Sequence, residues 1–286
     1  MNKESIMKRP FGATGLEISA VGLGGEGILR TFGEEERAAG VIGEAVHSGI
    51  AYFDCAQAYA GSESYYGRYW SAHPEHRDRV FQASKSANRT REGALADLER
   101  TLRTMAIDHL DLWQIHDVRT IQDLHAIAGP GGALEAFLEA KAQGKTRFIG
   151  VTGHHDPAVL TAAVRDWPVD AVMMPVNPVE GALGGFLDTT LVAAREKGLA
   201  VVAMKVLGAS HYLAPDVGVT AEVLIRFALS QPISVAIVGC SHPEHVRTLA
   251  QAGRHSSPLA EDESARLIDL YRPHAKRLAF YRGNLR

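Results

Sequence analysis

Three polar residues lie at the ends of short apolar runs of the sequence, and a fourth lies shortly after one of them. Asp54, Lys85 and His116 each lie at the end of such a run, and Tyr59 follows Asp54 by five residues. A tyrosine is a weak acid with an unperturbed pKa of about 10, and a nearby ammonium group stabilises its deprotonated form. A carboxylate keeps that ammonium charged and oriented. The four residue types could therefore act together as a proton donor to a substrate oxygen.

The alternation of side chains along these runs places the polar residues on one face. Side chains two positions apart in a strand point the same way, so Asp54, Lys85 and His116 fall in the inward-facing series. The alternate positions suit a layer packed against helices: Phe53, Cys55, Trp113 and Ile115. Cys55 is therefore interpreted as a buried structural thiol.

The elements that would hold these residues alternate between strand-like and helix-like patterns. Strands are predicted at 20–24, 51–55, 80–85, 110–116, 146–151, 171–176, 199–206 and 234–239. Helices are predicted at 34–47, 63–69, 92–105, 133–143, 157–166, 189–197, 220–230 and 243–252. A hairpin that turns at Gly12 to Gly15 precedes them, and a further helix (261–271) and a tail (272–286) follow. No element is assigned to 121–132.

Eight such units predict a (β/α)8 TIM barrel, in the α/β class, over residues 1–286 as a single domain. A doubly wound dinucleotide-binding fold would place G-x-G-x-x-G after its first strand. The first strand here ends in GLGGEG (22–27), whose glycine spacing is different. In a barrel, the C-terminal ends of the strands form the active face, and Asp54, Lys85 and His116 belong to that end.

Composition excludes several classes of protein. The chain has 286 residues, 46% of them hydrophobic, and a formal net charge of −3 without a basic cluster that would bind nucleic acid. No apolar run approaches the ~20 residues that span a bilayer, and the N-terminus lacks the apolar region of a secretory signal. Only Cys55 and Cys240 are present, which fits a reducing cytoplasm.

Several stretches, in the right order, resemble the aldo-keto reductase superfamily. GIAYFDCAQAYAGSESYYGR (49–68) is similar to its Asp-and-Tyr signature, and VFQASK (80–85) and DLWQIH (111–116) are similar to its lysine and histidine strands. GKTRFIGVTG (144–153), AVMMPVNP (171–178) and VVAMKVLG (201–208) continue the resemblance. It implies reduction of an aldehyde or ketone to an alcohol, or the reverse. Tyr59 would donate the proton, Lys85 would activate it with Asp54 as partner, and His116 would orient the carbonyl.

The resemblance also implies a nicotinamide cofactor bound across the barrel mouth, with NADP(H) favoured over NAD(H). The family's carboxamide-binding positions are occupied here by Thr152-Gly153 and Met173, with Asn177 nearby, and its ring-stacking position is occupied by Met204. In barrels, the loops after strands seven and eight favour phosphate. The residues expected to bind the cofactor are Gly24, Thr152, Asn177, Met204, Lys205, Leu207, Gly208, Gly239, Ser241 and His245.

Histidine pairs raise the question of a metal site. His73/His76 and His242/His245 have i, i+3 spacing, and His154/His155 are adjacent. A metal would need third and fourth ligands that the sequence does not place, so no metal is expected. His154 and His155 follow the fifth strand and are expected to line the substrate pocket.

Two other functions stay open. A Schiff-base lyase or aldolase could use Lys85 or Lys205, and borohydride trapping on lysine would favour it. A cofactor-binding regulatory subunit would bind the cofactor tightly and turn over little; the superfamily resembles the β-subunits of potassium channels. For the tail, 272–286, two interpretations compete: a cover over the substrate pocket, or a solvated terminus.

Overall fold

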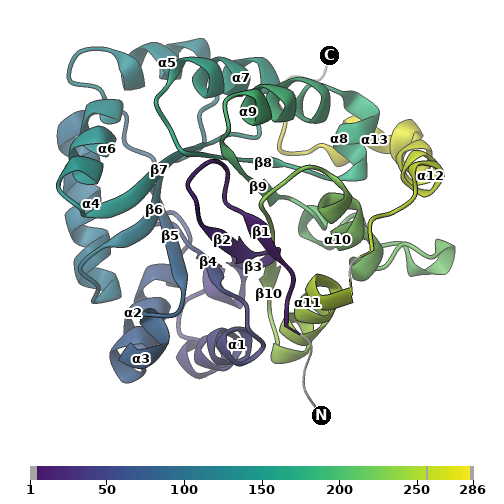
Figure 1. Ribbon diagram of the computed structural model, residues 1–286, viewed down its shortest axis with the longest axis horizontal. Helices are drawn as coiled ribbons and strands as arrows, with labels where there is room; N and C mark the ends of the chain where they lie inside the picture. Colours follow the sequence, from purple (N-terminus) through teal and green to yellow (C-terminus); the bar gives the residue numbers. More distant parts are fainter. Residues whose placement is uncertain (1–4, 256, 284–286) are drawn as a thin grey trace.

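The computed structural model describes residues 5–255 and 257–283, and its centre is a closed barrel of eight parallel strands (Figure 1). The strands follow the chain around the barrel, and β10 closes it by pairing with β3. They are β3 (Val21–Gly27), β4 (Tyr52–Asp54), β5 (Phe81–Ser86), β6 (Leu110–Ile115), β7 (Thr146–Thr152), β8 (Ala171–Pro175), β9 (Ala200–Met204) and β10 (Val235–Cys240). The predicted (β/α)8 barrel is confirmed.

Helices surround the barrel on all sides (Figure 1). They are α1 (Glu35–His47), α2 (Ser62–Ala72), α3 (Pro74–Arg77), α4 (Arg91–Met105), α5 (Ile121–Ala128), α6 (Ala133–Ala142), α7 (Pro157–Asp166), α8 (Pro178–Leu183), α9 (Leu191–Glu196), α10 (Ala221–Ser230), α11 (Pro243–His255), α12 (Glu261–Tyr271) and α13 (Ala275–Leu278). A π-helix, Phe186–Thr190, precedes α9. Within the described ranges, no helix is both long and apolar enough to cross a membrane.

The hairpin of β1 (Lys8–Pro10) and β2 (Glu17–Ser19) lies across one end of the barrel, as predicted (Figure 1). Phe11, in its turn, is fully buried and packs 4.8 Å from the ring centre of Phe81, the first residue of β5. The turn needs a glycine at position 12, because φ there is +56° and a Cβ would lie 2.4 Å from the backbone nitrogen of Ala200. The hairpin thus closes the end of the barrel at which the strands begin. The C-terminal ends of the strands, where the predicted polar residues lie, form the opposite end.

Strand alternation separates two apolar regions. The barrel interior holds side chains such as Tyr52, Ala83 and Leu112, whereas Trp113 and Cys55 lie in the layer between strands and helices. Cys55 is fully buried there, burial raises the pKa of its thiol, and its Sγ lies 3.2 Å from the carbonyl oxygen of Ala83. These facts agree with the prediction of a structural thiol.

Candidate active site

Three neighbouring strands bring the predicted polar residues together. Asp54 is the last residue of β4, Lys85 lies near the end of β5, and His116 directly follows β6. The register places Asp54 beside Ala83 and Lys85 beside Gln114, so the three side chains emerge at the same end of the barrel. Tyr59 reaches this end from the loop between β4 and α2.

Lys85 and Asp54 form a buried ion pair. Lys85 Nζ donates to Asp54 Oδ2 at 2.6 Å and to the backbone oxygen of Cys55 at 2.7 Å. Burial alone would lower the pKa of Lys85, but the charges of Asp54 and Tyr59 outweigh it and raise this pKa. The ammonium group is therefore held charged at the base of the site.

The ring of Tyr59 contacts both Lys85 and His116. Lys85 Nζ is 4.7 Å from the ring centre, and the His116 ring meets it edge-to-face at 5.5 Å. Burial raises the pKa of Tyr59 and Lys85 opposes that rise, so the hydroxyl keeps its proton at neutral pH, as a proton donor must. A Cβ at Gly25 would lie 2.6 Å from this ring, so the glycine run at the end of β3 makes room for Tyr59.

His116 is an uncharged imidazole. Burial, followed by repulsion from Lys85, lowers its pKa to about 3. Arg89 fixes the loop around it by donating to the backbone oxygen of His116 at 2.8 Å and to that of Asp117 at 2.7 Å. A neutral ring in this position can donate a hydrogen bond to a substrate oxygen without competing for the proton of Tyr59.

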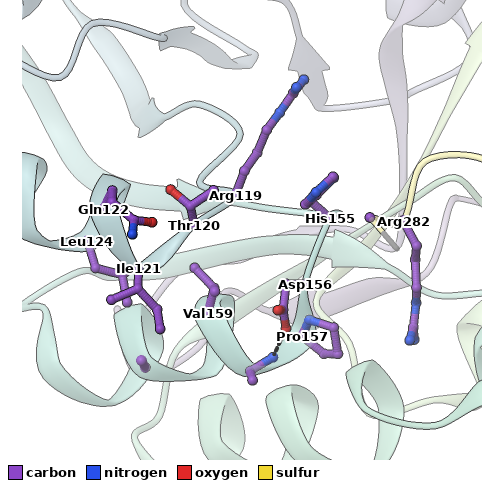
Figure 2. A pocket seen from close by; sticks show the side chains of 13 residues that line it. Arg119, Thr120, Ile121, Gln122, Leu124, His155, Asp156, Pro157, Val159 and Arg282 are labelled. Atoms are coloured by element: carbon purple, nitrogen blue, oxygen red, sulfur yellow. Dashed lines mark hydrogen bonds between the residues drawn. The ribbon is translucent and has the colours of Figure 1, made fainter. Parts of the chain in front are cut away.

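Two cavities open at this end of the barrel. One, of ≈ 580 Å³, is lined by Lys85 and His116 together with polar side chains such as Gln57, Asn88 and Arg100. The other, of ≈ 680 Å³, lies between the first turns of α5 and α7 and the tail, with Arg119, His155 and Arg282 in its wall (Figure 2). His155 thus lines a cavity. In His154, Nε2 lies 3.3 Å from Asp117 Oδ1, and Nδ1 lies 3.1 Å from the backbone oxygen of Tyr281.

The predicted cofactor residues after β9 and β10 lie at the same end. Gly24 and Gly239 are register partners, and a Cβ on Gly24 would lie 3.0 Å from the backbone nitrogen of Gly239. Ser241 and His245 flank the start of α11, where Ser241 N donates to His245 Nδ1 at 3.4 Å. Leu207 is half-buried and Gly208 has a φ of +53°.

Lys205 follows β9 with a φ of +56°. Its Nζ lies 6.0 Å from the ring centre of Tyr281, and no carboxylate within the described ranges forms an ion pair with it. Burial lowers its pKa. Its amino group thus lies near the barrel mouth, where an anionic ligand could engage it.

Three other predicted cofactor residues are buried. Asn177 Nδ2 donates to the backbone oxygen of Lys205 at 3.1 Å and to Tyr281 Oη at 3.0 Å, while its Oδ1 accepts from Glu180 N. Thr152 Oγ1 accepts from the backbone nitrogen of Asp117 at 2.8 Å. Met204 lies inside the barrel. Asn177 and Thr152 therefore use their polar atoms to support the site from within.

Sequence reasoning missed Arg30 and Tyr281. The guanidinium carbon of Arg30 lies 5.2 Å from the ring centre of Tyr59 and reaches it from the turn after β3. Tyr281 comes from the tail, more than a hundred residues after Asn177, which it contacts. No local motif marks either residue, because both act through tertiary contacts.

Comparisons with known proteins agree with this geometry. The sequence model of the Aldo/keto reductase family matches residues 20–216. L-galactose dehydrogenase of Arabidopsis thaliana is 33% identical over 162 residues, 52% of this chain and 49% of that protein, so the match spans about half its length. The uncharacterized oxidoreductase YqkF of Bacillus subtilis is 25% identical over 94% of this chain and 99% of its own.

Solved structures share the fold. Aldo-keto reductase AKR11C1 from Bacillus halodurans, in its holo form, superposes with a TM-score of 0.75 at 20% identity, covering 98% of this chain and 99% of its own. An aldo-keto reductase from Klebsiella pneumoniae in complex with NADPH gives 0.75 at 21% identity, covering 94% and 96%. The family match extends over well over half of the chain. This chain belongs to the aldo/keto reductase family.

Proposed function

We propose that the protein reduces an aldehyde or ketone with NADPH, or catalyses the reverse oxidation, with Tyr59 as the proton donor. The observation that carries this proposal is that the ring of Tyr59, which keeps its proton, contacts both the charged Lys85 and the neutral His116. A nicotinamide cofactor, when bound, would supply the hydride. As negative charge develops on the substrate oxygen, Tyr59 transfers its proton there, and Lys85 stabilises the tyrosinate that results.

The residues at the barrel mouth fit a dinucleotide phosphate. Lys205 offers a positive charge, and the first turn of the 13-residue α11 offers backbone N–H groups near Ser241 and His245. The loop at Leu207 and Gly208 lies beside Lys205 in the chain. The NADPH complex of the Klebsiella pneumoniae enzyme supports NADP(H) over NAD(H) as the cofactor.

The lining of the ≈ 580 Å³ cavity favours a polar substrate. Gln57, Asn88 and Arg100 could hydrogen-bond to hydroxyl groups of a substrate whose carbonyl lies near His116. L-galactose dehydrogenase is among the relatives. We therefore propose hydroxylated aldehydes and sugars as the substrate class. A panel of sugars and unsubstituted aldehydes, assayed by cofactor absorbance, tests it; a higher kcat/KM for the unsubstituted aldehydes would contradict it.

Replacing the hydroxyl of Tyr59 tests the mechanism. Tyr59→Phe keeps the ring and removes the proton, so kcat should fall by about 10²–10⁴-fold while the Kd of NADPH stays unchanged. Lys85→Met should lower kcat as well. The kcat of the double variant should be little lower than that of either single variant, because Tyr59 and Lys85 act together in one proton transfer. Steady-state kinetics and cofactor fluorescence on folded variants provide the measurement. A Tyr59→Phe enzyme with more than about a tenth of wild-type kcat, with chemistry rate-limiting, would show that another group is the acid.

A Schiff-base mechanism has one observation in its favour, the lowered pKa of Lys205. Lys85 is a poor candidate nucleophile, because Asp54 holds it in the protonated state. Borohydride in the presence of a carbonyl substrate would trap an adduct on Lys205 if this chemistry operated. The reductase proposal expects no adduct and a Lys205→Met variant whose main defect is a raised KM for NADPH.

A further inference from the structure

The tetrapeptide His-Pro-Glu-His occurs twice in this chain, at 73–76 and at 242–245. Both copies begin a helix with proline in the first turn, α3 for the first copy and α11 for the second. The identical sequence and the similar helical position make each copy a control for the other. Their side chains are nevertheless arranged differently.

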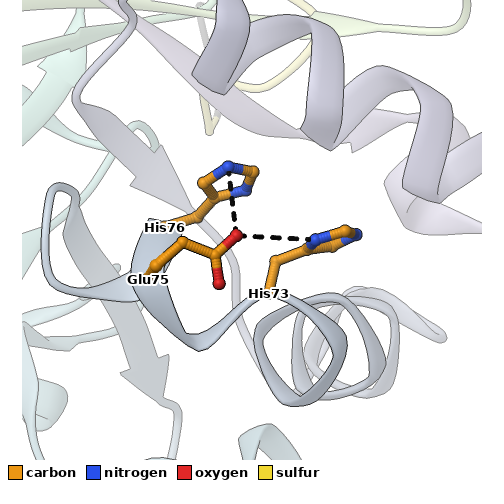
Figure 3. Close-up of side chains that lie close together, drawn as sticks. All are labelled: His73, Glu75 and His76. Carbon is orange, nitrogen blue, oxygen red and sulfur yellow. Dashed lines mark ion pairs between the residues drawn. The ribbon is translucent and has the colours of Figure 1, made fainter.

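In the first copy, three possible metal ligands converge. Glu75 Oε1 lies 3.8 Å from His73 Nδ1 and 3.6 Å from His76 Nε2, and the three ligand atoms lie within 4.8 Å of one another (Figure 3). With Zn–N distances of about 2.0–2.1 Å, ligands of a tetrahedral zinc lie about 3.3 Å apart. Small side-chain rotations would therefore bring these atoms to a single ion.

A neighbouring side chain orients His76 for this role. The hydroxyl of Tyr69 lies 3.1 Å from His76 Nδ1, and the two rings are nearly parallel, with centres 5.9 Å apart. If Nδ1 donates to Tyr69, Nε2 carries the free lone pair, and it lies 3.6 Å from Glu75 Oε1. Metal-binding histidines commonly hydrogen-bond through their second nitrogen in this way, which fixes both tautomer and ring orientation.

The second copy lacks this arrangement. Glu244 pairs with Arg247 at 2.7 Å, and His245 Nδ1 accepts a hydrogen bond from Ser241 N. The rings of His242 and His245 are perpendicular, at 86°, whereas those of His73 and His76 differ by only 20°. The carboxylate of the second copy is thus already neutralised by a cation.

We propose that His73, Glu75 and His76 form a binding site for one divalent cation of borderline softness, such as Zn²⁺. Two imidazole nitrogens and a carboxylate oxygen suit zinc, and a water molecule would complete the tetrahedron. The sequence predicted no metal because third and fourth ligands were missing; Glu75 supplies the third. The side chains of His73 and Glu75 are 46% and 57% exposed, so an ion enters without any rearrangement of the fold. Bound metal joins the end of α2 to α3.

Zinc titration of the full-length, untagged protein tests the proposal. Isothermal titration calorimetry with ZnCl₂ in a non-coordinating buffer should show one equivalent bound at micromolar concentrations, and excess Zn²⁺ should raise Tm. Glu75→Gln and His76→Gln should each weaken binding by at least tenfold. Tyr69→Phe should weaken it by about 10–100-fold, the usual effect of removing a hydrogen-bond partner of a ligand.

The second tetrapeptide supplies the matched control. Glu244→Gln makes the same change in the same local sequence and should leave zinc affinity within about twofold of wild type, well inside the 10–100-fold effects expected above. Circular dichroism confirms that each variant is folded. Absence of saturable binding by the wild-type protein would overturn the proposal. Wild-type affinity in both Glu75→Gln and His76→Gln would overturn it too, since the zinc would then be bound elsewhere.

Discussion

The ammonium group of Lys85 acts on two neighbours in ways that serve the same reaction. Burial lowers the pKa of His116, and Lys85 lowers it further, which helps to keep that ring neutral. Burial raises the pKa of Tyr59, and Lys85 opposes that rise. Asp54 keeps Lys85 charged through the 2.6 Å contact. Burial thus keeps both groups uncharged at neutral pH, while Lys85 reinforces the neutral state of His116 and makes the proton of Tyr59 easier to release.

The lowered pKa of His116 has a consequence for stability. In the unfolded chain its pKa returns to about 6.5, so below that pH the unfolded state takes up a proton that the folded state refuses until about pH 3. The contribution of His116 is fully present above pH 6.5 and is lost as the pH falls towards 3. Between pH 7 and pH 5, this group should account for about 2 kcal/mol of lost stability.

Urea unfolding of wild type and His116→Gln at the two pH values measures this effect. The variant cannot titrate at this position, so its stability should fall less between pH 7 and pH 5, by about 2 kcal/mol. Other titrating groups cancel in the comparison. Equal losses in the two proteins would mean that His116 is protonated normally in the folded state.

At the scale of elements, the tail is anchored through a buried ion pair. Glu180, fully buried in α8, accepts from Tyr281 Oη at 2.8 Å and pairs with Arg282. A solvated, frayed terminus therefore does not describe residues 279–283, while 284–286 lie outside the described residues. Because Arg282 also lines the ≈ 680 Å³ cavity, the tail contributes to the wall of that cavity.

The main effect of Arg282→Met should be a lower free energy of unfolding. It leaves the carboxylate of Glu180 buried without its cation, which should cost roughly 3–5 kcal/mol in urea unfolding. The double variant Glu180→Gln/Arg282→Met should recover most of that loss, because no unpaired charge remains. KM should rise in both variants if this cavity accepts part of the substrate, with the Kd of NADPH unchanged. A single variant as stable as wild type would show that Tyr281 alone satisfies Glu180.

The elements themselves were largely predictable. Each strand was expected within one or two residues of its observed bounds at most ends, because buried parallel strands are continuous apolar runs. The segment 121–132 was left without an element although it contains α5, whose Thr120 and Asp123 form a capping box. The π-helix and α8 were also missed, since neither is long enough to show a helical period.

The residues of the site also differ in whether the sequence predicts them. Asp54, Lys85 and His116 were predictable because strand ends in a barrel meet at one face, whatever the loops between them do. Arg30, Tyr281 and the role of Glu75 were not, because each depends on a side-chain contact set by tertiary packing. Asn177, which the sequence predicts to bind the cofactor, also has amide hydrogen bonds to Tyr281 and to the backbone oxygen of Lys205 that the sequence does not reveal.

At the scale of the whole molecule, the β1–β2 hairpin stabilises the end of the barrel opposite to the proposed catalytic residues. Phe11 is fully buried against Phe81 and Tyr52 at the closed end, whereas Tyr59 and Lys85 belong to the open end. Phe11→Ala should therefore cost about 3–5 kcal/mol of unfolding free energy. At temperatures where the variant is folded, kcat should remain near wild type. A large fall in kcat at full folding would reveal coupling between the two ends of the barrel.

The pairing of β3 with β10 also determines when the barrel can close during synthesis of the chain. Val21 pairs with Ala236, so the barrel cannot close until nearly all of the chain has been made. At a translation rate of about 5–20 residues per second, the ribosome needs roughly 10–40 s to travel from one partner to the other. Late in that interval, β3 to β6 and the loops that follow them, which together carry the whole proposed catalytic set, are outside the ribosome while the edge of β3 at Val21 is still unpaired. A nascent chain of this protein therefore has its proposed catalytic residues well before it has a closed barrel, and its unpaired strand edge is open to aggregation during that period.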